Sequence, residues 1–485
     1  MKTKYIFLGL IMCIAANVSA QTNTFYFMDE VPTRNAMNPA FMPNTKFYLD
    51  VLPSFYFEGG TNAFAVRDFL LKNKDKEWVT ALHPSQSAYK LYNRIPKTSE
   101  IGANVGLNII NFGFRVKEKN YFTFDFGVKA NAAAYLPKDL FKLVLFGTPD
   151  EDGINSFKLK NLGINATVYG EFGVGYTRQL TEKITVGGKL KGLVGVAGAY
   201  TKFKKFNLNA SKEQWEFEGQ GNAYLITPNI LSWNENEKKF DQNGFSNNWK
   251  DYIQGGGIAI DLGATYEPIK NLVVSVAVTD IGFINWNKPQ GIVQMSASSS
   301  FAFKGLEYTV GDSFDADYWS NTWDSIKNGL LYNYEIKNGD KNVSQSLTAS
   351  VNIGVEYGIL KNKISFGALS NTRINQSKVM QEITLAANFR PVEWFKAYLS
   401  YSFFDGRYSN LGLGLNLRMG PVNTYLVMDY IPLSFVRLSG ENTKFTLPYG
   451  MSRANFQAGM TFNFGRDSAK KNHEKTHDKK EKNKN

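Results

Sequence analysis

The sequence predicts an all-β fold, a transmembrane antiparallel β-barrel of about fourteen strands, and three observations predict it. An export signal stands at the N-terminus, apolar and polar residues alternate along many long segments, and short polar turns alternate with long connections. A tilted strand needs about 9–11 residues to cross a bilayer, whereas strands of soluble sandwiches usually have about five or six. The long alternating segments therefore favour a barrel over the alternative, a soluble sandwich with one wet face.

The first twenty residues have the pattern of a secretory signal peptide. Lys2 and Lys4 form a short positive region, residues 5–18 are apolar almost throughout, and Val18-Ser19-Ala20 offers small residues for cleavage. An apolar run of this length is too short for a comfortable transmembrane helix. We therefore expect residues 1–20 to be removed on export.

Cys13 raises the alternative of a lipoprotein signal. Met12 precedes it, where lipidation needs a small residue, so a signal without lipidation is favoured. Cys13 is also the only cysteine of the chain. The mature chain consequently has no thiol, no disulfide and no cysteine metal site, although it enters an oxidising compartment.

The composition is compatible with strands that cross a membrane and argues against helices that do so. The mean hydropathy is −0.29, and no apolar stretch of about 18 residues follows the signal. A moderately polar chain can still cross as strands, because only every second residue faces lipid. No linker rich in Pro, Ser or charge divides the mature chain. A closed barrel accounts for such length, because barrels grow by adding strands.

Alternation with a period of two is clearest near the C-terminus, between residues 454 and 464. One predicted face of that strand is apolar: Ala454, Phe456, Ala458, Met460, Phe462 and Phe464. The opposite face is small or polar: Asn455, Gln457, Gly459, Thr461 and Asn463. Residues 166–177 and 347–359 repeat the pattern, as expected for strands with one face toward lipid and one toward a lumen.

The turns give the strand count. Six connections are tight and polar: Lys117–Asn120, Thr181–Lys183, Pro268–Asn271, Lys361–Lys363, Pro391–Trp394 and Gly420–Asn423. The long connections are about 59–100, 136–163, 206–255 and 287–344, with shorter ones near 375–379, 407–410 and 439–451. Outer-membrane barrels have short periplasmic turns and long external loops. Six turns and seven loops predict fourteen strands with both termini in the periplasm.

The predicted strands are centred on fourteen segments. They are 47–57, 101–116, 121–132, 164–180, 184–200, 256–268, 271–284, 345–360, 363–374, 380–390, 394–405, 411–419, 422–433 and 452–465. Residues 213–227 and 291–310 also look extended, and we place them as hairpin extensions above the membrane. Counts of twelve or sixteen strands remain open. Within the external loops, residues 61–93 and 315–334 are predicted to be partly helical, capping the barrel mouth, lining a ligand cleft or meeting a partner.

Charged side chains recur on the face predicted to line the lumen. They are Asp125, Lys129, Glu171, Lys189, Lys191, Asp261, Glu267, Glu356, Arg390 and Arg418. Mixed charges inside a barrel either pair across the lumen or line an aqueous path, and pairing is the more frequent role. No single one of them is predicted to be a site.

The sequence offers little for catalysis or metal binding, and we expect no enzyme, no catalytic or metal site and no cofactor. The histidines are His83, His473 and His477, and no serine stands in a Gly-x-Ser-x-Gly motif. No histidine pair has ligand spacing within the predicted barrel. The Asp-x-Asp of Asp315 and Asp317 is too small a fragment to indicate calcium.

The tail, residues 466–485, carries much of the positive charge. The whole chain has a net charge of +12, and the tail holds eight Lys or Arg against four Asp or Glu. Such a segment cannot bury apolar surface, so we expect it to be disordered in the periplasm. The alternative is docking on anionic lipid headgroups or on an acidic periplasmic partner. No nucleic-acid partner is expected. The end of the last predicted strand, Phe462 to Phe464, resembles the signal read by the barrel-insertion machinery.

The mature N-terminus carries a specific resemblance. Residues 25–43 read Phe-Tyr-Phe-Met-Asp-Glu-Val-Pro-Thr-Arg-Asn-Ala-Met-Asn-Pro-Ala-Phe-Met-Pro. This opening resembles that of an uncharacterised outer-membrane family typical of the Bacteroidetes, named only as a domain of unknown function. More distantly, Asn38-Pro39-Ala40 is similar to a triplet near the N-terminus of the long-chain fatty-acid transporter (FadL) superfamily. Those proteins are fourteen-stranded barrels with an N-terminal lumen plug, and they include the PorV-type barrels of type IX secretion.

The resemblance implies that residues 21–45 are a plug inside a barrel formed by residues 46–465. Asn38, Pro39 and Ala40 would turn the chain into the wall. Prolines at positions 32, 39 and 43 prevent the segment from joining a sheet, and its aromatic side chains favour a dry environment. The ligand-binding positions of the fatty-acid transporters cannot be aligned, so the ligand-binding residues stay unknown.

Two functions are consistent with this sequence. The first hypothesis is passive uptake of a small, hydrophobic molecule through a plugged barrel in the outer membrane of a Gram-negative bacterium. The second is a non-transporting adaptor or anchor for exported proteins, as in PorV-type barrels, which the basic tail and the large loops favour. The expected surroundings are outer-membrane lipid and lipopolysaccharide in either case.

Overall fold

The computed structural model describes residues 22–466, except for 77, 82, 84, 148–154, 212–213, 229–230, 238, 244–245, 289–291, 298–299, 304–333, 376–377, 405–407, 433 and 440–443. The expected signal peptide, residues 467–485 of the basic tail and most of the helical segment expected at 315–334 lie outside the described residues.

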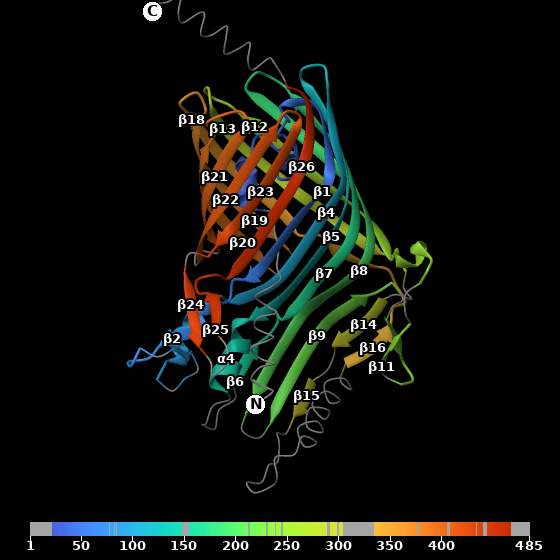
Figure 1. The fold of residues 1–485 in the computed structure, drawn as a ribbon. Coiled ribbons are helices and arrows are strands. Elements are labelled where there is room, and N and C mark those ends of the chain that lie inside the picture. The colour runs from blue at the N-terminus through green and yellow to red at the C-terminus, as the bar shows by residue number, and fades with distance from the viewer. Residues whose placement is uncertain are drawn as a thin grey trace, which may run out of the picture.

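Fourteen antiparallel strands close into a barrel (Figure 1). They are β1 (Thr45–Thr61), β4 (Thr98–Val116), β5 (Asn120–Pro137), β7 (Gly163–Gln179), β8 (Ile184–Ala210), β12 (Gly255–Tyr266), β13 (Leu272–Trp286), β18 (Ala349–Ile359), β19 (Ile364–Ile374), β20 (Val379–Phe389), β21 (Phe395–Phe404), β22 (Tyr408–Met419), β23 (Val422–Ile431) and β26 (Arg453–Arg466). Each pairs with the next, and β1 pairs with both β4 and β26. The predicted fold class and all fourteen predicted strands are confirmed.

The six predicted short turns lie at one end of the barrel, here called the turn end. Thr45 of β1 pairs with Arg466 of β26 at the same end, so the first and last strands begin and finish beside the turns. The register of each hairpin runs to the edge of its turn, as in Val116 opposite Asn120. The long connections gather at the opposite end, here called the loop end (Figure 1).

The loop end carries short helices and additional strands. The helices are α2 (Val66–Phe69), α3 (Ala88–Arg94), α4 (Lys138–Phe146) and the 3-10 turn η3 (Trp249–Tyr252). The strands are β2 (Leu70–Lys72), β3 (Trp78–Thr80), β6 (Asn155–Lys158), β9 (Trp215–Ile226), β10 (Leu231–Asn234), β11 (Lys239–Gln242), β14 (Ile292–Ala297), β15 (Ser300–Phe303), β16 (Tyr334–Asn338), β17 (Val343–Ser346), β24 (Phe435–Ser439) and β25 (Lys444–Pro448). The expectation of partial helix within 61–93 agrees with α2 and α3.

The two ambiguous extended segments lie outside the closed ring, as expected. Strand β9 pairs with the far half of β8, from Gly198 to Ala210, and with β14 and β15 on its other edge. The partner β9 explains why β8 runs for 27 residues, well beyond the predicted 184–200. The extension therefore adds no strand to the wall.

The alternation of the sequence corresponds to the two faces of the wall. In β26, Asn455, Gln457, Thr461 and Asn463 are buried toward the lumen, whereas Phe464 is 47% exposed on the outside. Leucines, isoleucines and phenylalanines form the exposed outer surface of most other strands. Such a large apolar surface indicates contact with lipid. In the described part of the chain, no helix is long and apolar enough to cross a membrane.

Candidate functional site: the lumen and the N-terminal segment

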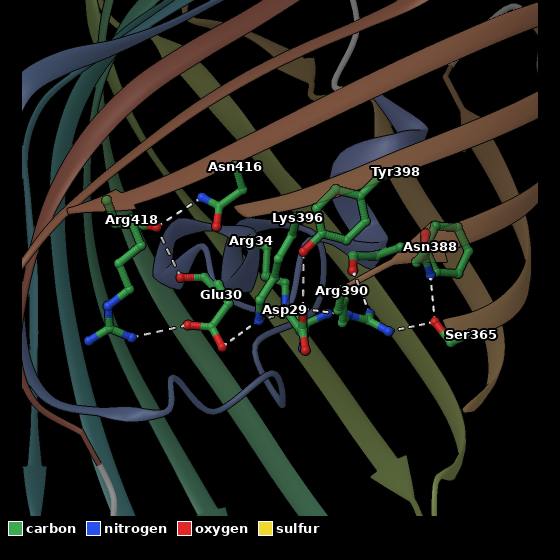
Figure 2. A network of polar contacts seen from close by, with 12 residues as sticks. Asp29, Glu30, Arg34, Ser365, Asn388, Arg390, Lys396, Tyr398, Asn416 and Arg418 are labelled. Atoms are coloured by element: carbon green, nitrogen blue, oxygen red, sulfur yellow. Dashed lines mark hydrogen bonds and ion pairs between the residues drawn. The ribbon is translucent and has the colours of Figure 1, made fainter. Parts of the chain in front are cut away.

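Residues 22–44, here called the N-terminal segment, lie inside the barrel (Figure 2). The segment contains two short 3-10 turns, η1 (Asn23–Phe27) and η2 (Pro32–Ala36). Proline fixes φ and lacks an N–H, so Pro32 suits the start of η2 and disfavours pairing with a strand. The segment therefore crosses the lumen as short turns whose side chains contact the wall.

The apolar side chains of the segment form a core with inward-facing residues of β19–β23. The members from the segment are Phe25, Tyr26, Phe27, Met28, Val31, Met37 and Phe41, and those from the wall are Leu369, Ala386, Tyr398, Tyr425 and Val427. The Tyr26 hydroxyl hydrogen-bonds with Ser275 at 2.8 Å on the far wall. Burial raises the pKa of Tyr26, so it stays a neutral hydrogen-bonding group.

Glycines in the wall make room for this core. A Cβ at Gly367 would lie 2.3 Å from Cε1 of Phe27. We expect Gly367→Ala to lower the free energy of unfolding by about 1–3 kcal/mol, because the packed ring cannot move aside without strain. Gly192→Ala is the matched control, since a Cβ there meets its nearest neighbour at 4.0 Å. Urea unfolding of both variants checks the expectation, and equal stability would contradict the packing of Phe27 on β19.

Two carboxylates of the segment bind three cations near the turn end (Figure 2). Arg390 donates to Asp29 Oδ1 at 3.1 Å, and the Tyr398 hydroxyl donates to the same oxygen at 3.1 Å. Glu30 accepts from Lys396 at 2.6 Å and pairs with Arg418 at 3.3 Å. These five charged groups, here called the latch, tie the segment to β20–β22.

The latch extends into the wall through Arg390. Its guanidinium also donates to Ser365 Oγ at 2.6 Å and to Glu356 Oε1 at 2.7 Å. Asn388 and Ser365 donate to Glu356 as well. Buried charges are stable only when both charge and hydrogen-bonding capacity are matched. Each charge of the latch has such a partner, so we expect the latch to hold the segment in this position.

A second contact with the wall lies at Thr24, toward the middle of the barrel. Its hydroxyl hydrogen-bonds to Asp429 and to Ser400, the latter at 2.6 Å. Asp429 and Tyr430 form a bulge in β23, where the register to β22 shifts and Tyr430 takes a φ of 65°. The bulge turns Asp429 toward the lumen, where it meets the segment.

The Asn38-Pro39-Ala40 triplet lies buried against β7, β8, β12 and β13. Asn38 Oδ1 accepts from the Ala40 amide at 2.9 Å, and Asn38 Nδ2 donates to the Val276 carbonyl at 3.4 Å. The Pro39 carbonyl accepts from the Thr177 hydroxyl at 2.6 Å. The Asn38 side chain thus closes a local turn and attaches it to the wall.

We expect Asn38→Ala to lower the free energy of unfolding by about 1–3 kcal/mol, because the Ala40 amide and the Val276 carbonyl lose a buried partner. Asn38→Asp keeps the acceptor for the Ala40 amide but loses the donor to the Val276 carbonyl, so its loss of stability should be smaller than that of Asn38→Ala. Thermal unfolding in detergent measures both. An Asn38→Ala variant as stable as the parent would contradict a structural role for the triplet.

The ten charges predicted to face the lumen do face it. Nine of them take part in ion pairs, and Glu267 accepts from the Asn271 amide at 2.9 Å. Lys129 pairs with Glu171 at 2.8 Å, and Lys191 pairs with Asp261 at 2.8 Å. Within the described residues, most of these charges therefore pair with one another across the lumen or along its wall.

Sequence reasoning missed other lumen charges. Lys396 shares the alternating face of Tyr398 and could have been found by that pattern. Asp280, which accepts from Lys191 at 2.6 Å, faces inward because a bulge gives it a φ of 58°, and alternation does not predict a bulge. Within the described residues, no group of His, Cys, Asp and Glu is arranged to hold a metal ion.

The described residues of the lumen enclose at least two cavities. The turn-side cavity has a volume of about 260 Å³ and is bounded by the N-terminal segment, including Tyr26 and Asp29, and by β12, β13 and β18. The loop-side cavity has a volume of about 130 Å³ and lies among β1, β4, β5, β7, β13, β18, β19 and β26. Residues of the segment line the turn-side cavity and not the loop-side one.

Several solved structures match the chain over most of its length at low sequence identity. The P. putida toluene transporter TodX is 9% identical, with 93% of this chain and 94% of that chain covered and a TM-score of 0.39. A Pseudomonas aeruginosa FadL homologue is 9% identical, with 93% and 100% covered and a TM-score of 0.38. The CymD monoaromatic hydrocarbon channel is 9% identical, with 90% and 94% covered and a TM-score of 0.32.

No curated protein matches the chain. The predicted resemblance to an uncharacterised family is confirmed by a match of the family model over residues 39–429. The chain belongs to the family of unknown function DUF5723.

Proposed function

We propose that this chain is an outer-membrane barrel, with its termini in the periplasm, that takes up small hydrophobic molecules along a route controlled by its N-terminal segment. The observation that carries the proposal is the division of the lumen. A cavity remains on the loop side, while the segment fills the middle and borders a second cavity on the turn side. A barrel that served only as a solid anchor would not need either cavity.

The contacts of the segment argue against an open aqueous pore. Its residues bond to Gln457 of β26, Thr384 of β20, Asn352 of β18 and Thr177 of β7, which lie around the whole ring. A general porin leaves a continuous water-filled channel. Passage here requires movement of the segment or a route through the wall.

Two measurements test the proposal. Detergent-purified protein mixed with fatty acids or bile-like amphiphiles should show bound ligand by native mass spectrometry and a higher unfolding temperature. Cells that carry the chain in a lipopolysaccharide-covered outer membrane should accumulate a hydrophobic fluorescent dye faster than cells without it, with unchanged entry of a small sugar. Clean mass spectra, no thermal shift and unchanged dye entry together would refute uptake.

One observation favours the second candidate, an adaptor for exported proteins. Tyr89 of α3 stacks on Phe146 of α4, with ring centroids 4.3 Å apart. Both Tyr89, at 65%, and Val144 of α4, at 73%, are nevertheless largely exposed. An exposed apolar patch at the loop end suits a protein partner. Crosslinking in intact membranes tests this. A reproducible partner that Tyr89→Ser and Val144→Ser remove, with dye entry unchanged, would support the adaptor.

A further inference from the structure

The loop-side cavity has two chemically different sides. Its polar side includes Glu100 of β4, Arg373 of β19 and Arg453 of β26, beside the charged pair of Lys129 and Asp280. Its apolar side includes Tyr169 of β7 and Leu347, which belong to the buried cluster of Trp286, Ile284 and their neighbours. One small cavity therefore offers both charged groups and a dry surface.

Arg373 has unused hydrogen-bonding capacity. Its guanidinium approaches Glu58 Oε1 at 3.6 Å and Glu382 Oε2 at 3.8 Å, distances too long for hydrogen bonds. Each carboxylate has a closer partner, since Glu58 accepts from Arg453 at 2.8 Å and Glu382 accepts from Tyr430 at 2.5 Å. No hydrogen bond from the Arg373 guanidinium to any described residue is present. A guanidinium has five N–H donors, and those of Arg373 are available to a ligand.

Glu100 offers the opposite charge in the same cavity. Its side chain is buried, with 8% of the residue exposed, and Oε2 has no hydrogen-bond partner among the described residues. The Nε of Arg453 is a buried donor that also has no hydrogen-bond partner among the described residues. Burying a charged or polar atom without a partner is costly. A ligand with a cationic and an anionic group would satisfy both sides at once.

The size of the cavity limits the ligand. One water needs about 10–15 Å³ on this scale, so a cavity of about 130 Å³ accommodates a group the size of roughly ten waters. This space fits a polar headgroup and the beginning of a chain, and not a whole long-chain molecule. A hydrocarbon alone would leave Glu100 Oε2 and Arg453 Nε without hydrogen-bond partners. A purely anionic headgroup would lie beside the Glu100 carboxylate, and a purely cationic one beside the Arg373 guanidinium.

We propose that the loop-side cavity binds the zwitterionic headgroup of an amphiphile, with its ammonium on Glu100 and its phosphate or carboxylate on Arg373. The first part of the apolar chain lies against Tyr169 and Leu347. This inference rests on the proposed uptake function and names its substrate class. The shared chemistry is an ammonium and an acidic group on one short linker, whether free or attached to a chain.

The test compares ligands that differ only in the head. The probes are lauroyl lysophosphatidylethanolamine, dodecyl phosphate, dodecanol and free phosphoethanolamine, each titrated into the purified full-length barrel by calorimetry. The zwitterionic amphiphile should bind at least tenfold tighter than the other three, because charge-assisted hydrogen bonds at both ends contribute. Free phosphoethanolamine binding as tightly as the amphiphile would overturn the role of the apolar side.

Variants locate the site. Arg373→Gln and Glu100→Gln should each weaken binding of the zwitterionic amphiphile about tenfold or more and leave dodecanol binding unchanged. Glu267→Gln, a carboxylate of the turn-side cavity, is the matched control and should have no effect. Gel migration with and without heating shows that each barrel is folded. Unchanged affinity in both variants would overturn the inference while the uptake function stands, whereas failure of every amphiphile to bind would refute both.

Discussion

Replacing Arg390 by methionine is expected to lower the free energy of unfolding by about 3–5 kcal/mol, among the largest effects of any single substitution in this chain. Arg390 is buried and joins the N-terminal segment, through Asp29, to Glu356 and Ser365 of the wall. Removing one member of a buried ionic network leaves the remaining charges unpaired, and that cost dominates. Urea unfolding in detergent, followed by the heat-dependent shift in gel migration, measures the change.

Lys363→Met is the matched control for Arg390→Met. Lys363 lies exposed in the turn between β18 and β19, where loss of a charge is expected to change stability by less than about 0.5 kcal/mol. If both variants unfold at the same urea concentration as the parent protein, the Arg390 network contributes nothing and the latch is not a fixed element.

The second large effect is expected from the double substitution Asp29→Asn and Glu30→Gln. Without these carboxylates, Arg390, Lys396 and Arg418 lose their partners on the segment and repel one another. We expect the segment to leave its position while the fourteen strands stay closed, because the wall keeps all its ladder bonds. Because Asn and Gln have nearly the same shape as Asp and Glu, any effect of the double substitution comes from the loss of the two negative charges.

Thiol labelling detects the release of the segment. The mature chain is expected to contain no cysteine, so Thr33→Cys introduces a single thiol at a position that is 3% exposed in the closed state. A membrane-impermeant maleimide should react with this thiol on the order of a hundredfold faster in the double variant than in the parent. Equal rates would show that Asp29 and Glu30 do not hold the segment. A second thiol at exposed Lys363 controls for the reagent.

The wall could be predicted from the sequence because two local rules decide it. A strand with one face toward lipid must alternate, as β26 does from Ala454 to Phe464, and a hairpin needs a short polar turn, as at Pro391–Trp394. These rules act over a few residues, so one sequence suffices to locate the strands and count them.

The interior could be predicted only in part, because its contacts join residues far apart in the chain. Arg390 meets Asp29 across 361 positions, and no local pattern links them. Asp280 and Asp429 face the lumen in β-bulges, where period-two alternation fails. The position of Arg373 relative to Glu100 depends on barrel closure and on which strands face each other. The two sides of the loop-side cavity therefore emerge only from the fold.

Ionic conductance across a planar lipid bilayer tests most directly the central claim that the N-terminal segment closes the lumen. The parent protein should insert without a steady open-channel current. A variant that lacks residues 22–37, which removes the latch and keeps the Asn38 turn, should conduct steadily, and the Asp29→Asn, Glu30→Gln variant should open intermittently. If the parent protein conducts as much as the deletion variant, the N-terminal segment does not close the lumen.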